Sequence, residues 1–284
     1  MTSLFAPALE TFLGQENGIF GPTSFQSYLT QHSLPRADTA RSISVDTYER
    51  LNNELKRHHA MVLRLGSSSN ESNTRFALVK VTDHLNDFFL FDDQVMTEQA
   101  STFLPTASFR QLYPYQLLGL HSETALVNLG FASGLINRSL DLDEDEGFGA
   151  PATGQSTFTF TLKAHQLLDS ELKHSKGQIQ IDALFVGKRD GKECLFVIEA
   201  KCQSREHSLA KHKLVYPIMA LAAQIPKDIG IVPVYAKILK VPEGILYHIV
   251  ECHFPDPRER ARSIDELRAV KHTGLLLPLS IVGR

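Results

Sequence analysis

The stretch that organises this sequence is IQIDALFVGKRDGKECLFVIEAK, residues 179–201. Its two apolar runs, 179–186 and 194–201, are rich in the β-branched and aromatic residues that favour strands. The polar segment between them is centred on Asp190-Gly191, a pair typical of a two-residue hairpin turn. The stretch therefore predicts two neighbouring antiparallel strands.

Three charged residues interrupt these apolar strands. Asp182 lies in the middle of the first strand, where aspartate is disfavoured and costly to bury without a partner. Glu199 and Lys201 lie two residues apart in the second strand, so both are expected on one face, about 7 Å apart at the backbone. A buried ion-pair network is one explanation, but such networks rarely improve stability over apolar packing. Two adjacent strands that break the same rule favour a functional site.

The flanking sequence predicts an α/β fold with a mixed sheet between helices. Helical spacing of apolar or charged residues predicts helices over 117–136, 205–224 and 258–268. Strand patterns beyond the hairpin predict strands over 157–162, 231–239 and 245–254. Ser122 is an alternative start for the first helix, and Pro217 is expected to bend the second.

The N-terminal part, residues 1–108, is predicted to be an α+β module attached to a catalytic domain at 109–284. Apolar residues near helical spacing predict a helix over 45–63, capped by Asp46. Strands are expected within 76–91. DNA recognition and dimerisation are the two functions considered for this module.

Composition sets only broad limits. The 284 residues are 43% hydrophobic with a net charge of −3, which neither indicates nor excludes a protein with a local basic cleft for nucleic acid. Three cysteines without a CxxC pair favour a reducing compartment and argue against a disulfide scaffold or a structural zinc site. Neither a signal peptide nor an apolar run of membrane-spanning length is present, so we expect a soluble, cytoplasmic protein.

The residue types at this hairpin suit phosphodiester chemistry. Two carboxylates, Asp182 and Glu199, form a hard-oxygen site suited to Mg²⁺ with several waters retained, and Mn²⁺ is expected to substitute. Such a metal polarises a phosphodiester and lowers the pKa of a bound water. Lys201 would orient the attacking water and offset the charge of the transition state.

The Asp182 strand, the short hairpin and the Glu199-Ala200-Lys201 triplet resemble the PD-(D/E)XK nuclease superfamily, the fold of many restriction endonucleases. The predicted order of elements from 117 to 254 is similar to the helix, three strands, helix and strand of that family's core. Ile181 stands where the motif has proline, a departure that the family often tolerates.

The resemblance implies an acidic residue on the first helix that reaches the metal directly or through water, and Glu123 is the match. The alternative for Glu123 is a first-turn glutamate that favours the helix dipole. Candidate DNA contacts are the side chains that follow the triplet: Gln203, Arg205, Lys211 and Lys213. A strand-end polar residue and a solvated helix face are the alternatives for them.

The most specific hypothesis is a type II restriction endonuclease that cleaves double-stranded DNA and leaves a 5′-phosphate, as the resemblance implies. The size is typical, an ATPase motif is absent, and the N-terminal module could supply target recognition. A palindromic target would require a homodimer with one active site for each strand. A repair or structure-specific nuclease of the same fold, and a non-catalytic DNA-binding protein, are the alternatives.

Overall fold

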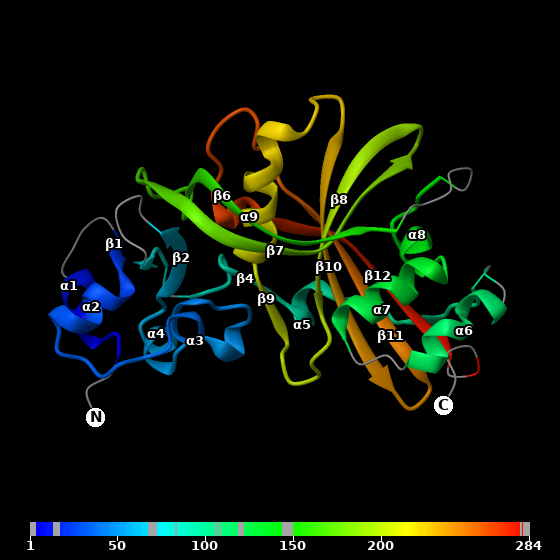
Figure 1. Cartoon of the computed structure of the whole chain (residues 1–284), viewed down its shortest axis with the longest axis horizontal. Coiled ribbons are helices and arrows are strands. Elements are labelled where there is room, and N and C mark those ends of the chain that lie inside the picture. Colours follow the sequence, from blue (N-terminus) through cyan, green and yellow to red (C-terminus); the bar gives the residue numbers. More distant parts are fainter. Residues whose placement is uncertain are drawn as a thin grey trace.

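A large mixed sheet runs through the molecule (Figure 1). The computed structural model describes residues 4–13, 18–67, 73–82, 84–105, 107, 109–118, 122–143, 150–278 and 280. In sheet order, the path across the sheet contains β1 (Ile19–Ser24), β3 (Thr74–Val79), β2 (Met61–Ser67), β7 (Glu171–Arg189), β8 (Lys192–Lys201), β10 (Gly230–Val241), β11 (Gly244–His253), β12 (Arg268–Pro278) and β5 (Ser101–Thr102). Off this path, β6 (Ala152–Lys163) pairs with β7, and a separate small sheet pairs β4 (Phe89–Phe91) with β9 (Ser208–Ala210).

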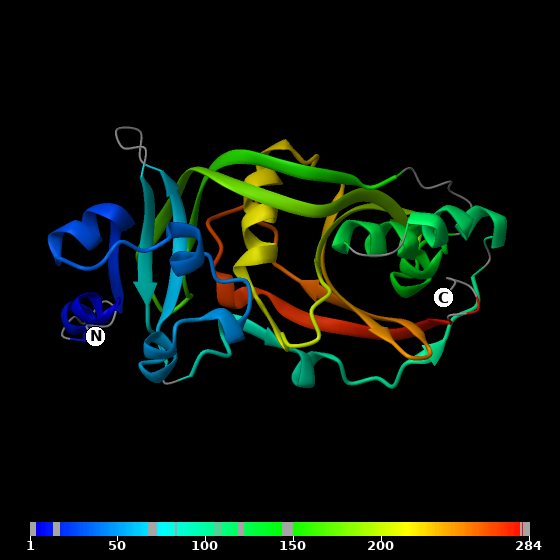
Figure 2. The ribbon, with the colours of Figure 1, turned by 60° about the horizontal axis from the view of Figure 1, so that its bottom comes forward.

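Helices flank this sheet, so the predicted α/β class is confirmed. They are α1 (Ala6–Leu13), α2 (Phe25–Gln31), α3 (Thr39–Ile43), α4 (Asn53–Arg57), α5 (Asp92–Val95), α6 (Phe109–Leu118), α7 (Glu123–Ala132), α8 (Leu135–Ser139) and α9 (His212–Leu221), with the short 3₁₀ turns η1 (Tyr48–Arg50), η2 (Ala222–Gln224) and η3 (Ile264–Glu266). Figures 1 and 2 place α1–α4 at one end of the elongated molecule, α6–α8 at the other, and α9 between them. None of the helices in the described residues has the length and apolar character needed to span a bilayer.

The predicted hairpin is confirmed. β7 and β8 pair antiparallel from the turn up to Ala183 opposite Ile198. Asp190 and Gly191 both adopt positive φ, 52° and 73°, which is the conformation of a tight hairpin turn. The carboxylate of Asp143 accepts hydrogen bonds from the backbone N–H groups of both turn residues, at 3.2 and 3.0 Å. Asp143 therefore fastens the turn.

β8 lies inside the sheet and is covered on both faces. It pairs antiparallel with β7 and parallel with β10, and α9 lies on the connection between β8 and β10. Val197 packs into the core that includes α9, whereas Phe196, Ile198 and Ala200 pack into the core that includes α7 and α8. Side-chain alternation therefore places Glu199 and Lys201 on the α9 face, and the prediction that they share one face is confirmed.

The helix predicted over 45–63 is wrong. Only η1 and α4 are helical there, and the buried run that begins β2 at Met61 follows. His59 has a φ of +52°, which ends the helical conformation. Asn52, and not Asp46, caps α4 by accepting a hydrogen bond from Glu54 N at 2.8 Å. The strands expected within 76–91 are present as β3 and β4.

Two other helix predictions need correction. In 258–268 only the single turn of η3 is helical, and β12 follows it as a strand that was not predicted. In 205–224 the α-helix begins only at His212, because β9 precedes it, and Pro217 lies inside α9. In 117–136 the alternative start at Ser122 is confirmed, since its Oγ accepts a hydrogen bond from Ala125 N at the beginning of α7. The strands expected at 157–162, 231–239 and 245–254 correspond to β6, β10 and β11.

The N-terminal strands join the rest of the sheet through β2. Gly66 of β2 pairs with Ser175 of β7 in parallel, and its positive φ of 70° favours glycine. A Cβ at this position would lie 2.2 Å from the carbonyl oxygen of Ser175. At the other edge, β5 pairs with β12. The division into modules at 1–108 and 109–284 stays a prediction, and hydrogen bonds link the two parts at both places.

Buried histidines make the stability of this fold sensitive to acid. Burial lowers the pKa of His174 to about 4 and that of His212 to about 3. An unfolded histidine titrates near 6.5, so below that pH the unfolded chain binds protons that the folded chain does not. We expect the free energy of unfolding to fall by about 1.4 kcal/mol per pH unit for each histidine between about pH 6 and 4.5. Urea unfolding at a series of pH values measures this slope. His174→Gln should reduce this slope by about 1.4 kcal/mol per pH unit. An unchanged slope would contradict the contribution of His174 to the pH dependence.

Candidate active site

The structure brings Asp182, Glu199 and Lys201 together where β7 and β8 separate. The Nζ of Lys201 donates a hydrogen bond to Oε1 of Glu199 at 2.8 Å. These two side chains are buried, with residue exposures of 3% for Glu199 and 7% for Lys201. Asp182 is close enough to Glu199 for its charge to raise the pKa of that carboxyl group. The three residues that broke the strand pattern therefore form one cluster.

Asp182 has partners that explain its place in a strand. The ladder between β7 and β8 ends at Ala183 opposite Ile198. Two residues further along β8, a backbone N–H bonds to a side chain of β7 instead of to its backbone. That donor is Ala200 N, which bonds to Oδ2 of Asp182 at 2.9 Å. Nε2 of Gln180 donates to Oδ1 at 3.2 Å. The partly exposed carboxylate is thus held in position while keeping contact with solvent.

Glu199 lies within a chain of alternating charges. Besides Lys201, the Nζ of Lys213 lies 3.3 Å from Oε1 of Glu199. Lys213 belongs to the first turn of α9 and also lies 3.6 Å from Oδ1 of Asp46. Two ammonium groups therefore compensate one buried carboxylate, which would otherwise be costly to desolvate.

The charge states follow from burial and from these partners. Burial raises the pKa of the Glu199 carboxyl, although the attraction of Lys213 and Lys201 opposes this. Burial also disfavours the charged form of Lys201, but the Glu199 carboxylate outweighs it and raises the pKa of Lys201 above its ordinary value. Lys201 is consequently protonated at neutral pH. It can donate hydrogen bonds and positive charge, but it cannot accept a proton from water.

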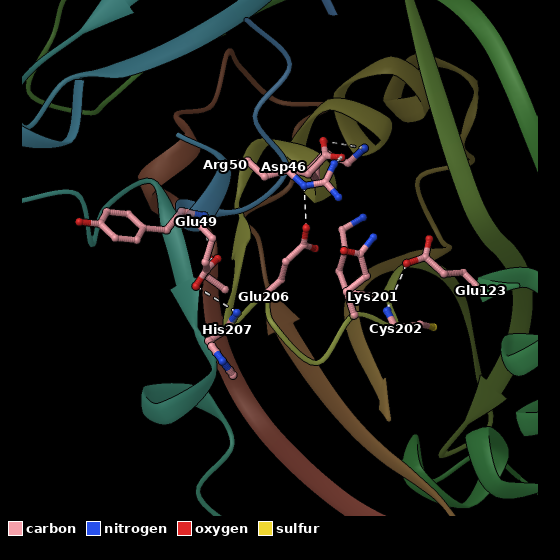
Figure 3. Close-up of polar contacts among 12 residues, drawn as sticks. Asp46, Glu49, Arg50, Glu123, Lys201, Cys202, Glu206 and His207 are labelled. Carbon is pink, nitrogen blue, oxygen red and sulfur yellow. Dashed lines mark hydrogen bonds and ion pairs between the residues drawn. The ribbon is translucent and has the colours of Figure 1, made fainter. Parts of the chain in front are cut away.

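Glu123, the predicted acid on the first helix, begins α7 and reaches the end of β8 (Figure 3). Its Oε1 accepts a hydrogen bond from Cys202 N at 3.2 Å. Its charge contributes to the raised pKa of Lys201, so the carboxylate lies near the cluster. Its place in the first turn also suits the helix dipole, as in the alternative interpretation.

The predicted DNA contacts separate into three groups. Gln203 and Arg205 have exposed side chains in the loop after β8, and the backbone carbonyl of Gln203 accepts a hydrogen bond from Lys237 at 2.8 Å. Lys213 is part of the charge cluster. Lys211 is only 8% exposed, and its nearest opposite charges include Asp87 and Asp265. The structure therefore does not bring Lys211 to the cluster or to the surface.

A segment far away in the sequence completes the site. Asp46, which the sequence suggested as a helix cap, pairs with Lys213. Close by, Nε of Arg50 bonds to Glu206 Oε1 at 2.6 Å, and Glu49 accepts a hydrogen bond from His207 N at 3.0 Å (Figure 3). Residues 46–50 thus lie against the loop that follows Lys201. No local pattern in the sequence predicts these contacts, because they depend on tertiary packing.

Residues 86–273, about two thirds of the chain, match the family model described as "Domain of unknown function (DUF6997)". The chain belongs to this DUF6997 family. The matched range contains Asp182, Glu199 and Lys201 with the whole β7–β8 hairpin, but it begins after Asp46. Neither a curated protein nor a solved structure matches the chain.

The two carboxylates of the cluster in this DUF6997 protein fit a Mg²⁺ ion that also takes ligands from water and substrate. Within the described residues, no three His, Cys, Asp or Glu side chains form a ready-made metal site. Asp182 and Glu199 offer hard oxygen ligands in the cluster, and Mg²⁺ commonly uses one or two carboxylates together with waters and substrate phosphate. The two carboxylates therefore suit a metal ion whose remaining coordination positions are filled by water and substrate phosphate. Glu123 fits better as a group that reaches such an ion through water than as a direct ligand.

Proposed function

We propose that this protein is a Mg²⁺-dependent endonuclease that hydrolyses DNA phosphodiester bonds at the Asp182–Glu199–Lys201 cluster, on a restriction-endonuclease-like core. The observation that carries the proposal is the position of these charges. A partly exposed carboxylate, a buried carboxylate and a protonated lysine meet where two central strands separate. A purely structural ion pair between Glu199 and Lys201 would not need the Asp182 carboxylate to accept the hydrogen bond from Ala200 N in place of a backbone carbonyl.

Each side chain has a role that its surroundings support. Asp182 and Glu199 would hold Mg²⁺, which supplies an activated water and a positive charge on the phosphate when bound. Lys201 stays protonated, and its ammonium group would donate hydrogen bonds to the attacking water or to the scissile phosphate. Lys213 orients Glu199 from the α9 side. Mn²⁺ is expected to substitute for Mg²⁺.

The more specific proposal is a type II restriction endonuclease that acts as a homodimer on double-stranded DNA and leaves 5′-phosphate ends. The exposed Gln203 and Arg205 lie in the loop directly after Lys201, where they would contact the DNA backbone. The N-terminal part contributes Asp46, Glu49 and Arg50 to the site and its following loop. This direct contact supports a role for that part in placing DNA, while the resemblance of the hairpin motif supports the choice of enzyme class.

Digestion of unmethylated phage DNA in Mg²⁺ tests this proposal. Discrete fragments are expected from the wild-type protein, and their ends should carry 5′-phosphates. A smear of products would contradict sequence specificity and favour a repair or processing nuclease. Binding of DNA without cleavage of duplex, flap or single-stranded substrates would contradict catalysis and favour a binding protein.

A further inference from the structure

A polar cavity of about 190 Å³ adjoins the charge cluster. Asp46 and Lys213 line this cavity, and Lys213 also contacts Glu199. The volume is far larger than the roughly 10–15 Å³ that a single buried water needs. The cavity and the proposed catalytic site are thus neighbours that share two charged residues.

Within the part of the chain that the structure describes, three polar atoms of the residues that line the cavity have no hydrogen-bond partner. They are Nδ1 of His174, Nδ1 of His212 and the hydroxyl of Tyr216, and each of these residues is more than nine-tenths buried. A buried polar group without a hydrogen bond costs free energy, so three such groups together need an explanation. A ligand that offers hydrogen-bonding groups to them would remove this cost.

The charges of the lining residues favour a neutral ligand over an anion. Burial keeps His174 and His212 uncharged at neutral pH. Of the two cations in the lining, Lys213 pairs with Glu199 and Asp46, and Arg64 donates a hydrogen bond to the hydroxyl of Ser44, another lining residue, at 3.0 Å. An anion would also meet the Asp46 carboxylate. The Asp46 carboxylate and the two uncharged histidines therefore favour a neutral ligand in this cavity.

Aromatic rings and amides complete the lining. The ring of Tyr216 lies 5.2 Å from that of His174 and 5.1 Å from that of His212, measured between centroids. Gln155 and Gln178, two exposed residues on the paired strands β6 and β7, also line the cavity. The rings meet at interplanar angles of 60° and 53°. Aromatic rings and side-chain amides are groups that proteins use to hold a nucleobase.

We propose that this cavity binds a single nucleobase taken out of the DNA helix, next to the phosphodiester bond that is cleaved. The inference rests on the proposed nuclease function and adds to it the way in which one base is recognised. A base can enter the cavity that His174, His212 and Tyr216 line only after it has left the stack. These polar atoms have less than 1 Å² of accessible surface, so the side chains would have to shift on binding to form hydrogen bonds to the base, and those bonds would offset the cost of unstacking.

Nucleoside binding to the full-length protein without metal tests the base site separately from cleavage. The four deoxynucleosides carry no phosphate, so they report on base binding alone, with 2-deoxyribose as the control. The readout is the imidazole NMR signals of isotope-labelled histidine. We expect at least one nucleoside at millimolar concentration to shift the signals of His174 and His212 saturably, while 2-deoxyribose does not.

Tyr216→Phe removes a hydroxyl that has no hydrogen-bond partner among the described residues, so the variant should fold with unchanged or higher stability. It is expected to weaken nucleoside binding by about three- to tenfold. Tyr115→Phe is the matched control, because the Tyr115 hydroxyl bonds to the Asn128 carbonyl outside the cavity. Absence of a saturable shift with all four nucleosides, or equal binding by Tyr216→Phe and wild type, would overturn the proposal.

The two proposals can fail independently. Lys201→Met is expected to lose cleavage but to bind nucleosides as the wild type does. Cleavage by wild type without nucleoside binding would refute the base site and leave the nuclease. Nucleoside binding without any cleavage would support the base site and refute the nuclease.

Discussion

Asp182→Asn is expected to reduce the rate of Mg²⁺-dependent DNA cleavage by about 10³-fold, which corresponds to ~4 kcal/mol of transition-state stabilisation. The substitution removes one of the two carboxylate charges proposed to hold the metal. The asparagine carbonyl can still accept the hydrogen bond from Ala200 N that Oδ2 of Asp182 accepts. Gln180 is exposed and can turn its amide to suit the new side chain. The free energy of unfolding should therefore change by less than about 1 kcal/mol.

Single-turnover cleavage of a labelled fragment and urea unfolding measure the two effects in the same protein. Asp143→Asn is the matched control. Asp143 also accepts hydrogen bonds from backbone N–H groups, but it does so at the hairpin turn. Its cleavage rate should remain close to that of the wild type. Cleavage by Asp182→Asn at the wild-type rate would mean that Asp182 serves only to terminate the ladder.

Lys201→Met is expected to reduce cleavage by about 10²- to 10³-fold, because it removes a preorganised positive charge beside the scissile phosphate. Methionine fills a similar volume at a position that is 7% exposed. Loss of one partner of a buried ion pair often costs about 3–5 kcal/mol of stability. A smaller cost is expected here, since Lys213 remains 3.3 Å from Glu199. Cleavage rates and urea unfolding of the variant test both statements.

Lys211→Met controls for the removal of a buried lysine. Lys211 is 8% exposed, close to the exposure of Lys201, but its surroundings include Asp87 and Asp265 and not Glu199. Its cleavage rate should stay near that of the wild type. An equal loss of cleavage in both variants would show that a general effect on the fold, and not the charge at Lys201, is responsible.

The sequence predicted the centre of the molecule well because the signals there are local. The Asp190-Gly191 turn and two apolar runs are sufficient to specify the β7–β8 hairpin. Alternation along β8 then places Glu199 and Lys201 on one face. The helix start at Ser122 is also a local signal, since its side chain caps α7.

Predictions failed where tertiary packing overrides a local pattern. The apolar residues of 45–63 fit a helix, yet the last of them enter β2 and pair with β3. Asp46 consequently lies beside Lys213 instead of at a helix end. β12 was missed although it pairs with β11 along most of its length. The cavity lined by His174, His212 and Tyr216 combines β7 and α9, so its unpartnered atoms cannot be recognised before the fold is known.

The metal dependence of DNA cleavage by the wild-type protein tests the proposed nuclease site most directly. Purified protein is incubated with end-labelled duplex DNA in Mg²⁺, in Mn²⁺ and in EDTA, and the product ends are determined. Cleavage is expected in Mg²⁺ and in Mn²⁺ but not in EDTA, and the products should carry 5′-phosphate ends. Cleavage that persists in EDTA, or its absence in Mg²⁺ on duplex, single-stranded and flap DNA alike, would contradict a metal-dependent nuclease site at Asp182, Glu199 and Lys201.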